Sequence, residues 1–327
     1  MKGIFTISLD FELHWGGFEK WPLEQYRTYF MNTRRVIPEM LRLFEQYEVH
    51  VTWATVGLLF CESRGQVMTE GPTEKPSYLQ PELGAYHYIA QHGIGADETE
   101  DPFHFAPSLV RAIMKTPHQE IASHTFGHYY CQEPGQEAAQ FRADLEAAQR
   151  VAARYGAVLR SLVFPRNQFN DDYLSACHDM GITSVRSNPL DWFWQIGSTQ
   201  QESYWKRLNR GLDAYFPVGT KNTYALEQLE VREGYPLFLP ASRLLRPYRP
   251  SEGLLNHLKL QRIGKEMRRA ADRGEVYHLW WHPHNFGHYP QQSVAGLERV
   301  LKQYAQLRDA GKMQSLHMQE IANLRRK

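Results

Sequence analysis

The sequence predicts an α/β protein with a mostly parallel sheet covered by helices, arranged either as an open sheet or as a barrel. Short β-prone runs alternate with helical stretches along most of the chain, and repeated β-α units produce parallel strands. The chain has 327 residues, which is long for one domain, but α/β barrels reach this length as single units. Hydrophobic residues make up 42% of the chain, as in soluble enzymes with a full core.

The expected elements follow from local patterning. Short β-prone runs predict strands over residues 3–9, 49–56, 120–123, 159–164, 182–185 and 275–281. Apolar residues at helical spacing predict helices over residues 23–47, 107–114, 136–155, 171–180, 254–272, 293–310 and 318–325. A region at about 60–105 is rich in proline, glycine and charge, which indicates an insertion rather than barrel core.

Composition excludes several classes of protein. The formal net charge is +1, so no overall field favours nucleic acid as the partner. The three cysteines form no C-x-x-C pair, which argues against a disulfide framework or a structural zinc knot. We find no apolar run long enough for a transmembrane segment and no secretory signal pattern. We therefore expect a cytoplasmic protein.

Residues suited to catalysis follow four of the predicted strands at their carboxyl ends, where the chemistry of α/β barrels gathers. They are Asp10 and Glu12, His124 and His128, Arg166, and His282. One carboxylate, two histidines and an open position are what a catalytic zinc site requires. A further aspartate and histidine are suited to acid–base catalysis.

Three histidine pairs have a spacing of four residues: His124/His128, His278/His282 and His284/His288. The second pair lies along a strand, where four residues span about 13 Å, too far for two ligands of one metal. The third pair lies in a loop with proline and glycine, where we expect a solvated edge. The first pair lies just past a strand, where a turn can bring both imidazoles together. With a carboxylate, this pair favours zinc and leaves cobalt, nickel or iron open.

The order of these motifs resembles that of the polysaccharide deacetylases, the chitooligosaccharide deacetylase homology domain of carbohydrate esterase family four. ISLDFE resembles the first family motif, HQEIASHTFGH the metal-binding H-[ST]-x-x-H motif, VFPRNQ the third motif and VYHLWWHPH the last. The resemblance covers residues 1 to about 192 and resumes at about 254. It implies one domain over residues 1–327, a distorted or incomplete (β/α) barrel of about seven parallel strands, with insertions at about 60–105 and 193–250.

The resemblance also implies a role for each site residue. Asp10 corresponds to the general base, which Arg166 would hold, and His282 to the general acid. The metal ligands would be Glu12, His124 and His128.

Three departures from the family pattern stand out in the sequence. Phe11 separates two carboxylates that are usually adjacent, and Arg166 follows rather than precedes its proline. In the segment SNPLDW, either Asn188 or Asp191 could take the position of the aspartate in the fourth motif.

The function implied is that of a zinc-dependent deacetylase that hydrolyses the N-acyl amide of an amino sugar. A cytoplasmic location favours a precursor of a cell-surface polysaccharide, in nucleotide-linked or lipid-linked form. Two alternatives stay open. The protein could be an amidohydrolase for a non-sugar or cyclic amide, or a metal-containing sugar-binding protein without turnover, which would need neither Asp10 nor His282.

A basic stretch from Arg243 to Arg273 contains nine Lys or Arg residues against three Asp or Glu. It is typical of the solvated face of a helix. The alternative is a surface that receives phosphate groups, with Arg243 and Arg246 as the residues to test.

Overall fold

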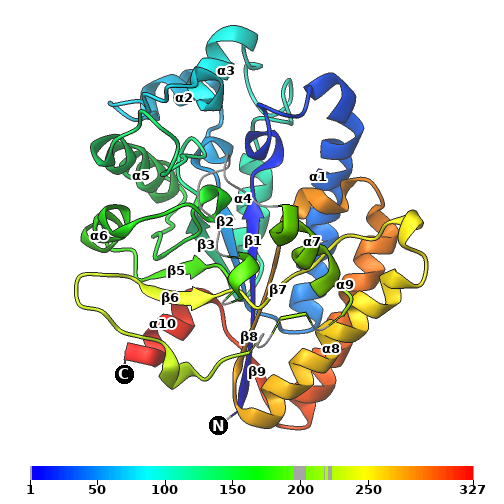
Figure 1. Ribbon diagram of the computed structural model, residues 1–327. Helices are drawn as coiled ribbons and strands as arrows, with labels where there is room; N and C mark the ends of the chain where they lie inside the picture. The colour runs from blue at the N-terminus through cyan, green and yellow to red at the C-terminus, as the bar shows by residue number, and fades with distance from the viewer. Residues whose placement is uncertain (1, 190, 195–203, 217, 220–222, 327) are drawn as a thin grey trace.

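The computed structural model describes residues 2–189, 191–194, 204–216, 218–219 and 223–326. Figure 1 shows a curved parallel sheet in the middle of the molecule with helices around it. No helix of these described residues is long and apolar enough to span a membrane. The predicted incomplete (β/α) barrel is confirmed.

The sheet has nine strands in the described part of the chain, and all its strand pairings are parallel. The order is β6-β5-β4-β3-β2-β1-β8-β7, and β9 pairs with β1. The strands are β1 (Gly3–Phe11), β2 (Val51–Thr55), β3 (Gln119–Ser123), β4 (Ser161–Leu162), β5 (Ser184–Ser187), β6 (Leu237–Pro240), β7 (Arg243–Leu244), β8 (Val276–Trp281) and β9 (Met313–Ser315).

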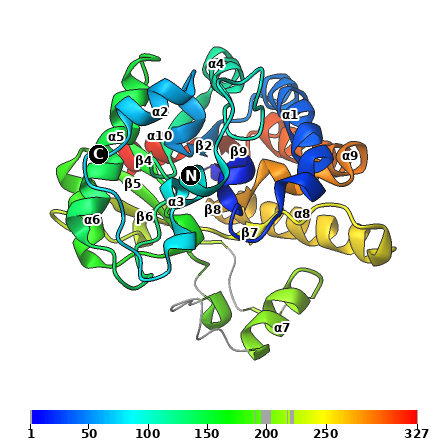
Figure 2. The same ribbon diagram turned by 90° about the horizontal axis from the view of Figure 1, so that it is seen from above.

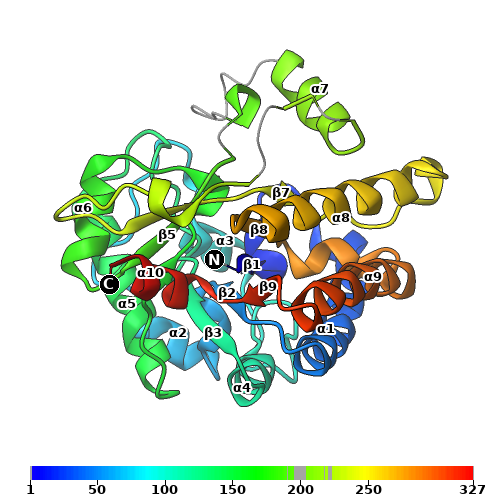
Figure 3. The same ribbon diagram turned by 90° about the horizontal axis from the view of Figure 1, so that it is seen from below.

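Helices cover the outer face of the sheet, as the view from above shows (Figure 2). The α-helices of the described residues are α1 (Leu23–Gln46), α2 (Arg64–Glu70), α3 (Ala85–His92), α4 (Pro107–Lys115), α5 (Ala138–Ala153), α6 (Asp171–Asp179), α7 (Tyr204–Asp213), α8 (Leu255–Arg273), α9 (Pro290–Asp309) and α10 (Met318–Arg326). Helix α7 projects from the barrel in Figure 2, and Arg243 of β7 and Arg262 of α8 contact its residue Asp213. Helix α10 lies across the lower end of the barrel in Figure 3.

The two predicted insertions have different outcomes. Residues 60–105 contain α2 and α3 and no strand of the sheet, but Val67, Ala85 and Phe103 of this region pack in the main core, where none was expected. The second region, 193–250, was wrongly expected to lie wholly outside the barrel, because it supplies β6 and β7. These strands have only four and two residues, too few for a period-2 pattern to be recognised. Residues 195–203 of this region lie outside the described residues.

Strand β1 is the central strand and is buried along its whole length. Alternate side chains of a strand point to opposite faces, and one set, Phe5, Ile7, Leu9 and Phe11, packs in the main core with helices α1 and α5. The other set begins with Ile4 in a second cluster, to which α10 contributes Met318 and Ile321. It continues as Thr6, Ser8 and Asp10. The barrel interior therefore changes from apolar at its amino end to polar at its carboxyl end.

A cluster of histidines and glutamates lies near the amino ends of β2 and β3. The Nδ1 of His317 lies 3.2 Å from Glu120 and its Nε2 lies 3.5 Å from Glu320. His50 contacts the same Glu320 oxygen at 2.7 Å and stacks on His118. Burial disfavours the charged imidazole, but the bond to Glu120 and the two carboxylates raise the pKa of His317 above its ordinary value.

We expect this cluster to make stability depend on pH. A histidine whose pKa is raised by folding contributes fully to the free energy of unfolding at pH values below its unfolded pKa of about 6.5. This contribution is lost as the pH rises through the folded pKa. The free energy of unfolding should therefore fall as pH rises above about 6.5, and His317→Gln should reduce this slope. Urea unfolding at a series of pH values measures the dependence of the free energy of unfolding on pH. His178→Gln is the control, because His178 is an exposed residue of α6; an unchanged slope in His317→Gln would contradict the expectation.

Candidate functional site

Five of the six predicted site residues border a cavity of about 520 Å³, and His124 lies behind them in contact with Glu12. Asp10, Glu12, His128, Arg166 and His282 all line it. Two of these residues lie directly at strand ends. Asp10 is the second-last residue of β1, and His282 follows the last residue of β8. A second cavity of about 750 Å³ lies beside the first and shares Lys20 and Trp21 with it.

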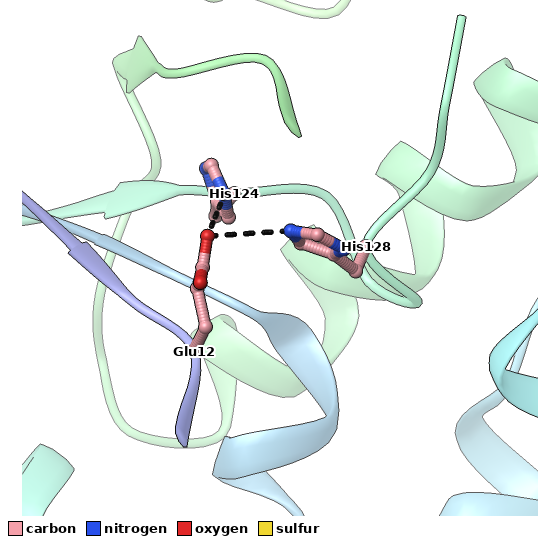
Figure 4. Close-up of side chains that lie close together, drawn as sticks. All are labelled: Glu12, His124 and His128. Atoms are coloured by element: carbon pink, nitrogen blue, oxygen red, sulfur yellow. Dashed lines mark hydrogen bonds and ion pairs between the residues drawn. The ribbon is translucent and has the colours of Figure 1, made fainter. Parts of the chain in front are cut away.

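Glu12, His124 and His128 converge on one point (Figure 4). Oε1 of Glu12 lies 2.9 Å from Nε2 of His124 and 3.3 Å from Nε2 of His128. All three side chains are buried. The ligand atoms of a tetrahedral zinc lie roughly 3.3 Å apart, so these separations are compatible with one shared ion.

The loop after β3 brings the two histidines together. Thr125 and His128 both have left-handed backbone conformations, with φ of 63° and 58°, which are uncommon for residues other than glycine. Asp144 of α5 holds the loop by accepting hydrogen bonds from the backbone N–H groups of Phe126 and Gly127 at 2.6 and 3.0 Å. Burial raises the pKa of Asp144 to about 7, although these two bonds oppose the shift.

The hydrogen bond of His124 leaves a lone pair directed at the carboxylate. Nδ1 lies 2.8 Å from the carbonyl oxygen of Val163, which can only accept, so Nδ1 carries the proton. In the neutral ring Nε2 then has only a lone pair, yet it lies 2.9 Å from Oε1 of Glu12. This contact requires either a second proton on the ring or a cation between the two atoms.

His128 repeats this arrangement through Tyr130. The Tyr130 hydroxyl donates to Glu19 at 3.3 Å and therefore accepts from Nδ1 of His128 at 3.1 Å. Burial lowers the pKa of His128, which favours the neutral ring, and contact with Glu12 only partly offsets this. Two lone pairs thus face one carboxylate oxygen, and a divalent cation would turn this repulsion into coordination. The residues fit a metal.

The carboxylate of Glu12 has further neighbours that keep it ionised. Burial alone would raise its pKa, but the charge of His282 and the contacts with the two loop histidines lower it well below the ordinary value. Asp10, Glu12 and His282 also form a group of three potential ligands within 4.8 Å of one another. A Cβ on Gly16 would lie 1.8 Å from Oε2 of Glu12, so only glycine leaves room for this side chain.

Asp10 is held by a buried arginine of β5. The Arg186 guanidinium donates to both Asp10 oxygens, at 2.6 and 2.7 Å, and also to Oγ of Ser8 at 3.1 Å. Nε2 of His282 lies 3.5 Å from Asp10 on the cavity side. Burial would raise the pKa of Asp10, but Arg186 first and His282 second lower it below the ordinary value.

The prediction that Arg166 holds Asp10 was wrong, because Arg186 takes that place. Arg166 forms ion pairs with Glu19 and Glu133 and lies 3.9 Å over the ring of Tyr130. Its backbone is left-handed, with φ of 53°, so the chain turns sharply after β4. Arg166 therefore supports the Glu19–Tyr130 chain behind His128 rather than the acid–base group.

The position of Arg186 in the sequence is itself a signal of a buried ion pair. Arg186 is a charged residue inside the short strand SVRS. Alternate side chains of such a strand point into the barrel. A buried charge is almost always paired, so an arginine at such a position predicts a buried carboxylate partner.

The prediction that His284 lies at a solvated loop edge was also wrong. It is buried, with Nδ1 3.8 Å from Oε2 of Glu12 and its ring 4.9 Å from that of His282. Burial and the charge of His282 lower the pKa of His284 to about 3, so the ring is neutral. Neither Asn188 nor Asp191 lines the cavity, whereas the aromatic rings of Trp194 and Trp280 do.

Comparison with known proteins identifies the family. Residues 28–185 match the model of the polysaccharide deacetylases. Residues 28–185 of the chain belong to the polysaccharide deacetylase family. The matched part contains His124, His128 and Arg166, while Asp10 and His282 lie outside it. No curated protein matches the chain significantly.

Solved structures share the fold at low sequence identity. A protein named as a polysaccharide deacetylase from Mycobacterium smegmatis is 14% identical with a TM-score of 0.60, over 100% of this chain and 91% of its own. One from Pseudomonas aeruginosa is 12% identical with a TM-score of 0.54, over 98% and 89%. PuuE allantoinase is 12% identical with a TM-score of 0.55, over 98% and 88%. At such identities the similarity shows the fold alone.

The two arginines can be distinguished by substitution. Removing one partner of a buried ion pair costs about 3–5 kcal/mol, so we expect Arg186→Met to lower the free energy of unfolding by this amount and to raise the pKa of Asp10. Arg166→Met should leave the pKa of Asp10 unchanged. Urea unfolding and NMR titration of the Asp10 carboxyl group measure both effects. The double variant Asp10→Asn/Arg186→Met should recover part of the lost stability; a raised Asp10 pKa in Arg166→Met alone would refute the assignment.

Proposed function

We propose that this family member is a metal-dependent deacetylase that hydrolyses the N-acyl amide of an amino sugar, with zinc as its metal. The observation that carries the proposal is the grouping at one cavity of a ligand set, Glu12 with two histidines, and two proton-transfer groups, Asp10 and His282. Imidazole and carboxylate ligands suit zinc, and cobalt, nickel or iron would occupy the same donors.

The metal would supply the polarisation of the amide carbonyl and the acidification of a water molecule. Asp10 would take the proton from that water. Its lowered pKa keeps it ionised, and it lies beside the ligand set, whereas Glu12 is the carboxylate that contacts the two loop histidines. Arg186 would fix the orientation of Asp10 through two parallel hydrogen bonds. Its positive charge keeps the carboxylate ionised at neutral pH, at the expense of basicity.

His282 would deliver the proton to the leaving nitrogen. An amine is a poor leaving group until it is protonated, so the reaction needs an acid as well as a base. His282 is only partly buried and contacts Asp10 and Glu12 at 3.5 and 3.6 Å.

The substrate that we propose is a cytoplasmic precursor of a cell-surface polysaccharide, linked to a nucleotide or a lipid. A cavity of about 520 Å³ is within the range of about 300–1,000 Å³ that small-molecule sites occupy.

The similarity in fold to an allantoinase supports a second candidate, an amidohydrolase for a non-sugar or cyclic amide. A sugar-binding protein without turnover would not require the acid–base pair of Asp10 and His282.

Substitutions should separate the metal ligands from the proton-transfer groups. We expect Asp10→Asn and His282→Ala to keep the metal and lose about 10²- to 10⁴-fold in kcat, the latter chiefly with poor leaving groups. Glu12→Ala, His124→Ala and His128→Ala should lower metal affinity, with activity partly restored by excess metal. Metal content by mass spectrometry and acetate release from a panel of N-acetyl sugars and cyclic amides give the two readouts.

His178→Ala, on the exposed face of α6, is the control for loss of a histidine and should change neither readout. If Asp10→Asn removes the metal while Glu12→Ala retains it, the roles of the two carboxylates are reversed. Turnover of cyclic amides alone would favour the second candidate, and metal binding without any turnover would favour the sugar-binding alternative.

A further inference from the structure

The cavity of the candidate site has a strongly positive rim in addition to its carboxylates. Lys20, Arg166, Arg246 and Arg249 all line it. Three of these cations have carboxylate partners on the protein, and the partner of Arg249 is Glu252, at 4.0 Å. Lys20 lies 3.4 Å from Glu19, and Arg166 pairs with the same Glu19 and with a second glutamate.

Arg246 differs from the other arginines near the site. It is half-buried and donates one hydrogen bond, from Nη2 to the backbone oxygen of Arg210 at 2.9 Å. Among the residues that the structure describes, no carboxylate lies within ion-pairing distance of it. Burial lowers the pKa of Arg246, and the charges of Arg249 and Arg243 add to this effect, while Tyr215 and Glu252 only partly offset it. The cation therefore remains undercompensated.

Arg243, three residues earlier, shows the contrasting case. It donates to both oxygens of Glu266 at 2.7 Å and lies 3.2 Å from Asp213, with almost no exposed surface. The hypothesis that Arg243 receives a phosphate group is therefore wrong. Of the two arginines named for this role from the sequence, only Arg246 reaches the cavity.

The segment that carries Arg246 and Arg249 is fixed by hydrogen bonds to α8 and α9. The side chain of Asn256 accepts from the backbone N–H of Arg249 at 3.1 Å and donates to its carbonyl at 2.7 Å. Lys259 donates to the carbonyl of Pro247, and Ser293 accepts from the N–H of Tyr248. Anchoring of this kind lowers the entropy cost of binding a ligand.

We propose that Arg246, together with Arg249, forms a subsite for an anionic group on the substrate, a phosphate or a carboxylate. The inference rests on the proposed function and gives its substrate class: an N-acyl amino sugar that carries a negative charge. A guanidinium can bind either anion through two parallel hydrogen bonds. Arg249, which is exposed and 4.0 Å from Glu252, would add a second charge at the mouth of the cavity.

Matched substrates test this subsite. The probes are methyl N-acetylglucosaminide as the neutral sugar, N-acetylglucosamine 1-phosphate, and N-acetylmuramic acid as the carboxylate. Hydrogen bonds to charged groups contribute about 1.5–3 kcal/mol, so Arg246→Met should reduce the ratio of kcat/KM between anionic and neutral substrates by roughly 10- to 100-fold. Whether the ratio falls for the phosphate or for the carboxylate identifies the anion.

Arg269→Met is the control, because Arg269 belongs to the same basic stretch but is exposed on α8. It should leave the ratio unchanged. A wild-type enzyme that prefers neither anionic sugar, or an equal fall of the ratio in both variants, would overturn the proposal.

A binding measurement separates this proposal from the proposed function. If no N-acetyl sugar is turned over, the proposed function fails, and calorimetry with glucosamine 1-phosphate against glucosamine still tests the subsite. Tighter binding of the phosphorylated sugar that Arg246→Met abolishes, at equal metal content, would support the subsite. Equal affinity of the wild-type protein for the two sugars would overturn it.

Discussion

The buried ion pair between Asp10 and Arg186 is the contact on which the arrangement of the site depends. It joins β1 to β5, which are separated by three strands in the sheet order. In a flat sheet these strands would lie about 19 Å apart, four spacings of about 4.8 Å. The pair can form only because the sheet curls. Arg186 also lies 4.4 Å over Trp280 of β8, so this residue of β5 contacts two other strands, β1 and β8, across the barrel interior.

The same ion pair separates the environments of two neighbouring carboxylates. Asp10 and Glu12 point to the same side of β1, where two negative charges would raise the pKa of one of them if nothing intervened. Each has its own source of positive charge instead. Asp10 has Arg186, and Glu12 has the surrounding imidazoles of His282, His124 and His128. Their different partners, rather than their order in the sequence, support different roles for the two groups.

The sequence predicted the residues that stand directly at strand ends, because their positions are determined by the strand itself. Asp10, Glu12 and His282 are of this kind, and His124 follows β3 in the same way. It did not predict which way the chain turns afterwards. Arg166 was expected beside Asp10, but a left-handed turn directs it to Glu19 and Glu133. His284 was expected in solvent, but its loop folds back over the site. Both outcomes depend on tertiary packing, which residue spacing does not encode.

The arginines around the cavity show how burial and pairing determine what a cation can do. Arg186 and Arg243 each contact carboxylates through parallel hydrogen bonds, so their charges are compensated and they act as structural links. Arg166 is likewise compensated, and its effect reaches the candidate metal ligands only through Glu19 and Tyr130. A guanidinium can bind an external anion strongly only when no internal carboxylate competes for the same N–H groups. By this criterion, the number of arginines in a basic stretch exceeds the number that can bind an external anion. Contact with a carboxylate of the protein determines which arginines remain available for such binding.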